Sequence, residues 1–177
     1  MHAKSCHEAW WFLFDSNPNR SQILNITKKY YSFFETVRPA LYTTFVVKLA
    51  SIFDEDSKSI SLKALVEEIE MKTNIIFRSK SIDFDDLWKR GRRLYKYRNK
   101  VIAHRDKEVL TRNFAKETGF EYNDLKAILD DSCIFLDEVL HFTGRKKFNR
   151  LPSASELEKL IRDLSYNAQH PAAKNGA

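Results

Sequence analysis

Three residues near the middle of the chain have the types and spacing of an acid–base site for phosphodiesters: Arg98, Asn99 and His104. A histidine, whose ordinary pKa is about 6.5, can give or take a proton near neutral pH. An arginine can bind a phosphate through two N–H groups and stabilise the charge that develops on it. RNA carries its own nucleophile, the 2′-hydroxyl, so these residues could cleave it to 2′,3′-cyclic phosphate and 5′-hydroxyl ends without a metal ion. Asn99 could orient either the phosphate or the imidazole.

The arginine stands where the sequence pattern demands an apolar residue. Helical spacing predicts a helix over residues 83–105 whose apolar face is Phe84, Leu87, Trp88, Gly91, Leu94, Tyr95, Val101 and Ile102. Arg98 falls on this same face, and an isolated buried guanidinium is costly. The nearest acid along the chain, Asp106, is eight residues on and about 80° around the helix. We therefore expect a homodimer whose two-fold axis lies near Arg98, so that both copies contribute Arg98, Asn99 and His104 to one cleft.

A second face of the same helix is basic. Between residues 89 and 107 the cations are Lys89, Arg90, Arg92, Arg93, Lys96, Arg98, Lys100, Arg105 and Lys107, against the single acid Asp106. Such a face is usually only a solvated surface, but a charge this one-sided also suits a nucleic-acid backbone. The residues expected to contact RNA are Arg93, Tyr97, Lys100 and Arg105.

The segment Tyr97-Arg-Asn-Lys-Val-Ile-Ala-His-Arg-Asp106 resembles the HEPN superfamily. Further segments are similar to its abortive-infection U-type branch: Leu41-Tyr-Thr-Thr-Phe-Val-Val-Lys-Leu-Ala50, Phe53-Asp54 and Ser59-Ile-Ser-Leu62. The resemblance spans about residues 21–164. It implies an all-helical dimer and, in many members, a metal-independent endoribonuclease with Arg98, Asn99 and His104 as its catalytic residues. Some members are thought to have lost catalysis.

Composition independently favours helices. The 177 residues include only 4 Gly and 4 Pro, too few turn formers for a many-stranded sandwich or barrel. A hydrophobic content of 43% is too high for a disordered chain. We expect a single all-α domain over residues 1–165, a compact bundle of about five or six helices, followed by a frayed tail at 166–177.

Periodicity and capping residues predict where these helices lie. The expected ranges are 3–14, 21–38, 40–53, 61–71, 83–105, 123–142 and 155–164, with N-caps at Ser21, Ser61, Asp83, Asn123 and Ser155. Pro39 is expected to end or kink a helix near Arg38. Gly144 suits the residue after a helix C-terminus.

Nothing in the sequence indicates a membrane segment, a targeting segment or a cofactor. The mixed apolar stretch at 41–53 is shorter than the roughly 20 residues that cross a bilayer. Two unclustered cysteines, Cys6 and Cys133, are typical of reduced thiols in a cytoplasmic protein. The acids of 54–56 and 83–86 fall at a loop and a helix start, where acids are common. We therefore expect no metal site.

Two functions fit these observations. The first is a metal-independent endoribonuclease that acts in phage defence or as a toxin, with RNA as substrate and an antitoxin or regulatory protein as a further partner. The second is a non-catalytic helical module that binds nucleic acid or a protein through the same helix. The sequence leaves both open, together with the RNA target.

Overall fold

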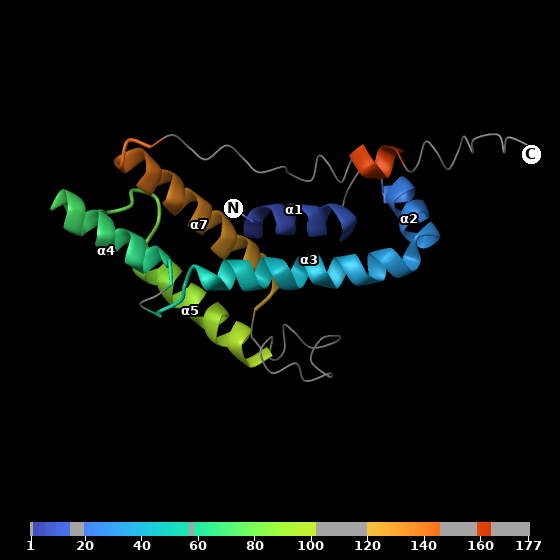
Figure 1. The fold of residues 1–177 in the computed structure, drawn as a ribbon, viewed down its shortest axis with the longest axis horizontal. Coiled ribbons are helices and arrows are strands. Elements are labelled where there is room, and N and C mark those ends of the chain that lie inside the picture. Colours follow the sequence, from blue (N-terminus) through green and yellow to red (C-terminus); the bar gives the residue numbers. More distant parts are fainter. Residues whose placement is uncertain (1, 15–19, 57–58, 102–119, 146–158, 164–177) are drawn as a thin grey trace, which may run out of the picture. The chain divides into compact units, whose positions relative to one another are not determined.

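The computed structural model describes residues 2–14, 20–56, 59–101, 120–145 and 159–163 (Figure 1). Its labelled helices are α1 (His2–Phe14), α2 (Arg20–Lys29), α3 (Tyr31–Ser51), α4 (Leu62–Thr73), α5 (Phe84–Val101) and α7 (Tyr122–Phe142). Residues 159–163 are also helical, and no strand occurs in these ranges. The prediction of an all-α fold is confirmed.

The chain divides into two compact units. One consists of Met1–Phe45 with Arg150–Ala177, and the other of Val46–Asn149. The expectation of one domain over residues 1–165 stays a prediction. The expected tail at 166–177 and the helix start at Ser155 lie outside the described residues.

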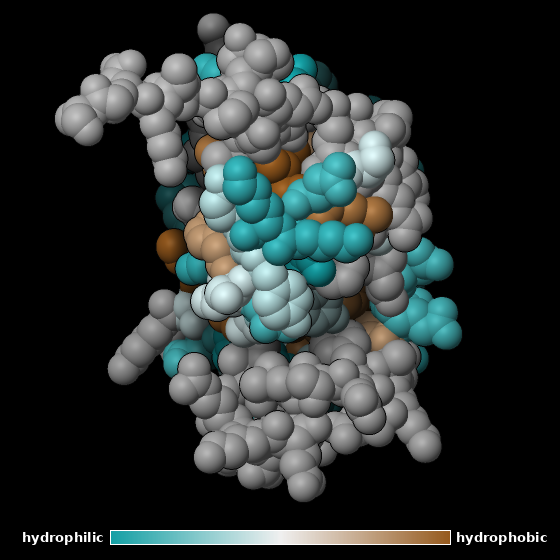
Figure 2. Space-filling model, turned by 90° about the vertical axis from the view of Figure 1, so that its right-hand side faces the viewer, coloured by the Kyte–Doolittle hydropathy of each residue, from teal (hydrophilic) through white to brown (hydrophobic). Residues whose placement is uncertain are grey.

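The first unit is built around the aromatic helix α1. The ring of Trp10 lies 5.1 Å from that of Tyr42, and the ring of His7 lies 5.0 Å from that of Phe45. A buried apolar cluster joins α1, α2, α3 and residues 159–163 through Leu13, Ile23, Ile26, Phe34 and Ile161. Figure 2 shows the side of the molecule on which α2 lies, where hydrophilic side chains stand in front of hydrophobic ones.

The expectation that a helix ends at Pro39 is wrong, whereas the alternative that Pro39 kinks the helix stays a prediction. The boundary lies at Tyr30, between α2 and α3, and α3 continues through Pro39 to Ser51. Proline removes one backbone hydrogen bond and usually kinks a helix. Here Pro39 is exposed, so water can replace that bond, while Val37 and Leu41 pack against the buried cluster and hold the helix together.

The second unit is built around α5, which packs on α7. Leu87, Leu94, Leu125 and Ile128 are fully buried. The connection between α4 and α5 is fastened to α7 through Glu138, whose Oε2 accepts from Ser79 Oγ at 2.5 Å and from the backbone N–H of Lys80 at 2.9 Å. These contacts fix the start of α5, the helix that carries the candidate site.

Local capping signals gave mixed results. Ser61 caps α4 by accepting from the N–H of Ala64, and Gly144 has the expected positive φ of 67°. Asp83 caps α5, because its Oδ1 accepts from the backbone N–H groups of Asp85 and Asp86.

Two expected caps are displaced. Ser21 falls inside the first turn of α2, which begins at Arg20. Asn123 does not cap α7, because Glu121 and Asp124 form a reciprocal capping box that satisfies two backbone N–H groups instead of one.

One close contact in this unit gives a testable prediction. Gly91 faces the fully buried ring of Phe53, and a Cβ atom at position 91 would lie 2.1 Å from Cδ1 of that ring. At an ordinary helix position Gly→Ala stabilises by about 1 kcal/mol. Here Gly91→Ala should instead lower the free energy of unfolding by about 1–3 kcal/mol, because the overpacked core must shift.

Urea denaturation followed by circular dichroism measures this change. The matched control is Lys96→Ala at an exposed position of the same helix, which should change stability by less than about 0.5 kcal/mol. A Gly91→Ala protein more stable than the wild type would contradict the packing described here.

Candidate functional site

The structure brings Arg98 and Asn99 together near the end of α5. The guanidinium of Arg98 donates to Asn99 Oδ1 twice, from Nε at 3.0 Å and from Nη2 at 2.7 Å. Both side chains are half-buried. Because Oδ1 is engaged in this way, the amide N–H groups of Asn99 are the donors with which it can meet a phosphate or an imidazole.

The ring of Tyr95 supports this pair. The guanidinium carbon of Arg98 lies 4.5 Å from the ring centroid of Tyr95, and that of Arg92 lies 4.9 Å from the same centroid. Arg92 is itself anchored, since it donates to the backbone oxygen of Phe53 at 3.1 Å and forms an ion pair with Glu55. The ring is therefore a fixed support, and cation–π attraction orients Arg98 upon it.

Asp54 is the site residue that the sequence analysis missed. Its pKa is lowered from the ordinary value, first by the backbone N–H of Asp56, then by the hydroxyls of Tyr95 and Ser59 and by the charge of Arg98, against an opposing effect of burial. The charge of Arg98 is the weakest of these causes, so Asp54 is held chiefly by its own loop and by Tyr95. The pair Phe53-Asp54 was among the segments similar to the HEPN branch, and that was the available signal.

The partners of Arg98 bear on one step of the sequence argument. Arg98 was expected to have no acid near it in the sequence, and a two-fold axis close to it was expected to resolve the conflict. The structure gives the guanidinium two partners from its own chain, Tyr95 and Asn99. The homodimer itself stays a prediction.

The arginines of the basic face are not equivalent. Arg90 is paired with Asp86 at 2.7 Å and with Asp131 at 2.6 Å. Burial opposes its charge, but these hydrogen bonds outweigh burial and raise the pKa of Arg90. Arg93 is exposed, and its guanidinium carbon lies 5.1 Å from the ring centroid of Phe120. Arg93 is thus more accessible to an anionic partner than Arg90.

The other predicted site residues fall into two groups. Tyr97 is only 9% exposed, so its ring is turned inward and does not offer a stacking surface for a base. His104 and Arg105 lie outside the described residues, as does the side chain of Lys100. Their roles stay predictions.

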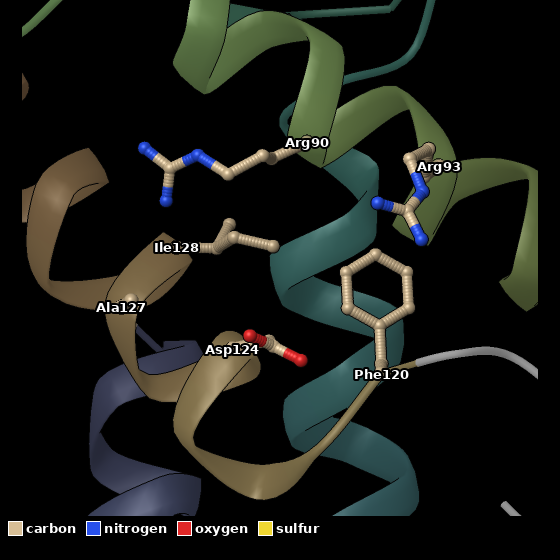
Figure 3. A pocket seen from close by; sticks show the side chains of 6 residues that line it. All are labelled: Arg90, Arg93, Phe120, Asp124, Ala127 and Ile128. Carbon is tan, nitrogen blue, oxygen red and sulfur yellow. The ribbon is translucent and has the colours of Figure 1, made fainter. Parts of the chain in front are cut away.

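A cavity opens beside Arg93, between α5 and the start of α7 (Figure 3). Arg90 and Arg93 line it from α5, and Phe120, Asp124, Ala127 and Ile128 line it from the other side. Among the described residues, no group of three or more His, Cys, Asp or Glu side chains could hold a metal ion. None of the helices in those ranges is long and apolar enough to cross a membrane.

Helices throughout the described ranges, with an arginine–asparagine pair near the end of α5, are what the HEPN resemblance implied. The family model described as AbiU2, of HEPN type, matches residues 2–164. The chain therefore belongs to the AbiU2 family of HEPN proteins, and the match begins nearer to the N-terminus than the expected residue 21. No curated protein and no solved structure matches this chain.

The contacts of Asp54 predict a pH-dependent stability. A lowered pKa in the folded state means that the stabilisation is complete above the unfolded value of about 3.9 and disappears as the pH falls through the folded value. Asp54→Asn should therefore destabilise the protein at pH 7, by about 1 kcal/mol for the hydrogen bonds it weakens. The difference from the wild type should shrink towards pH 2.

Thermal unfolding of both proteins across this pH range is the measurement. Glu67→Gln serves as control, because Glu67 is an exposed carboxyl whose surface ion pair with Lys63, at 3.9 Å, contributes little. An effect of Asp54→Asn that is equally large at pH 2 and pH 7 would show that the Asp54 carboxylate charge is not the cause.

Proposed function

We propose that this chain is a metal-independent endoribonuclease that cleaves RNA by attack of the 2′-hydroxyl on the adjacent phosphate. The observation that carries the proposal is the Arg98–Asn99 pair, preassembled on Tyr95 in a chain of the HEPN family. A fixed guanidinium costs little reorganisation when charge develops on the phosphate, which is the condition for electrostatic catalysis.

In this proposal each residue has a distinct role. Arg98 contacts the scissile phosphate and stabilises the phosphorane-like transition state. His104 removes the proton from the 2′-hydroxyl or protonates the leaving 5′-oxygen, and Asn99 donates to the phosphate or to the imidazole. Asp54 is a positioning residue that acts through Tyr95 and Arg98.

Electrostatics support RNA as the partner. Lys89, Arg93 and Lys96 are exposed cations of α5, and Lys100 and Arg105 follow along the chain. Cations along one helix favour a phosphate backbone and make binding salt-dependent. The products are RNA fragments with 2′,3′-cyclic phosphate and 5′-hydroxyl ends.

The family name AbiU2 supports a role in abortive infection. We propose that the enzyme acts in the cytoplasm in phage defence or as a toxin, where an antitoxin or regulatory protein restrains it. Unrestrained cleavage of RNA would stop growth of the host cell, and this is why such an activity needs a regulator.

The first test separates cleavage from binding. His104→Ala should abolish the appearance of 2′,3′-cyclic ends in a mixed RNA pool yet leave RNA affinity nearly unchanged, because a neutral imidazole contributes little charge. Wild-type cleavage should continue in EDTA. His141→Ala is the matched control, since His141 is an exposed histidine at the end of α7.

Three outcomes would refute the assignment. His104→Ala could cleave at the wild-type rate, which would remove His104 from the mechanism. Chelator could stop cleavage until Mg²⁺ or Mn²⁺ is added, which would make the enzyme metal-dependent. Wild-type protein that binds RNA without cleaving it would instead be the non-catalytic binding module.

The second test concerns the homodimer, which we retain as part of the proposal because the HEPN resemblance implies it. If Arg98, Asn99 and His104 of two copies share one cleft, specific activity per chain should fall on dilution as the dimer dissociates. Light scattering at the same concentrations measures the molecular mass. A monomer with full activity per chain at every concentration would rule out the shared cleft.

A further inference from the structure

The cavity between α5 and α7 has the chemistry of a binding site. Its volume is about 180 Å³, several times what a single water needs. The wall formed by Phe120, Ala127 and Ile128 is apolar, and Phe120 and Ile128 are buried (Figure 3). An apolar wall with a few polar groups is typical of a site for a small organic ligand.

The polar groups of the cavity are one cation and one anion. Arg93 is exposed and its guanidinium lies over the ring of Phe120. Asp124 is exposed, and its Oδ2 accepts from the backbone N–H of Glu121 at 2.8 Å, which leaves Oδ1 as an acceptor for a ligand. The guanidinium of Arg90 is occupied by Asp86 and Asp131, so Arg90 contributes its aliphatic stem to the wall.

This arrangement discriminates between ligand classes. The carboxylate of Asp124 repels a phosphate, and the guanidinium of Arg93 repels a cation. The favoured ligand is neutral and planar, with acceptors on one edge for the arginine and donors on another edge for the carboxylate.

Among the four RNA bases, guanine presents this pattern. Its O6 and N7 are adjacent acceptors that suit a guanidinium. Its N1–H and N2–H₂ are adjacent donors that suit a carboxylate. Adenine and cytosine offer a single amino group beside ring acceptors, and uracil offers one N–H between two carbonyl groups.

We propose that this cavity is a guanine-binding subsite that selects the RNA bound by the ribonuclease. The inference rests on the proposed function, because it specifies which RNA the proposed ribonuclease would bind. Arg93 precedes Arg98 by five residues, which is about 7.5 Å along the helix and about 140° around it. The RNA must therefore pass around α5 to reach both residues, and the selected guanosine lies several nucleotides from the bond that Arg98 contacts.

The test uses RNA that cannot be cleaved, so that binding is measured without activity. A 2′-fluoro hexauridylate lacks the nucleophilic hydroxyl, and four variants of it carry one guanosine, adenosine, inosine or 7-deazaguanosine, each likewise with fluorine in place of its 2′-hydroxyl. Fluorescence anisotropy with wild-type protein should show that one guanosine raises affinity about 5- to 100-fold, whereas one adenosine does not. Inosine lacks the N2 amino group and 7-deazaguanosine lacks N7, so each should lose most of this gain.

Protein variants test the residues. Asp124→Asn retains an oxygen for the cap of α7 but loses the charge and one acceptor. It should abolish the preference for guanosine, measured as the ratio of the affinities for the guanosine oligonucleotide and for hexauridylate. Asp130→Asn is the matched control. Asp130 lies on the same helix, forms an ion pair with Lys126 at 2.6 Å and does not line the cavity. It should keep the full preference.

The two proposals fail separately. Equal affinity for the guanosine, adenosine and uridine oligonucleotides, or a guanosine preference that survives Asp124→Asn, would overturn the subsite even if the enzyme cleaves RNA. A guanosine preference that depends on Asp124 in a protein without ribonuclease activity would support the subsite and refute the proposed function. The analogue series needs no variant, so a misfolded Asp124→Asn protein would not leave the question open.

Discussion

The contact between Phe53 and Gly91 decides where the charged groups of the site meet. The ring of Phe53 is fully buried and occupies the space that a side chain at position 91 would need. Because the ring is held there, the next residues along the chain, Asp54 and Glu55, reach the side of α5 that carries Arg92, Tyr95 and Arg98. An apolar contact thus fixes an electrostatic arrangement. The buried ring of Phe53 therefore holds the loop that carries Asp54 and Glu55 close to α5.

The positive charge of α5 is divided between support and recognition. Arg90 and Arg92 are paired with carboxylates of α5, α7 and the loop at residues 54–56, so they fasten the helix to its surroundings. Arg93 is the exposed guanidinium of this helix in the described residues, and Arg98 is half-buried on a tyrosine ring. A count of charges along the sequence overstates the field that RNA would meet, because two of these arginines already have anionic partners.

Local patterns predicted the helices well and tertiary contacts poorly. The apolar face of residues 84–95 and the cap at Asp83 depend on neighbours within one turn, and both are found in the structure. The electrostatic effect of Arg98 on Asp54 acts between residues 44 positions apart, which no helical periodicity encodes. Pro39 illustrates the opposite error, since a local rule predicted that a helix ends or kinks there, whereas α3 continues and Val37 and Leu41 pack against the buried cluster on either side. Tyr97 was expected to contact RNA because it lies among the basic residues of this helix in the sequence, although the packing of α5 on its neighbours buries it.

The position of Arg98 bears on how the proposed enzyme would divide binding from catalysis. Before the reaction the substrate phosphate carries a single charge, and Arg98 attracts it. As the 2′-oxygen attacks, negative charge accumulates on the phosphorane oxygens and the attraction to Arg98 grows. An interaction that strengthens in the transition state raises the rate of the chemical step, whereas uniform binding only lowers KM. On the proposed mechanism, ground-state affinity then comes chiefly from the exposed cations of α5 and the guanine subsite. Arg98 and Asn99, already oriented by Tyr95, act when the charge develops.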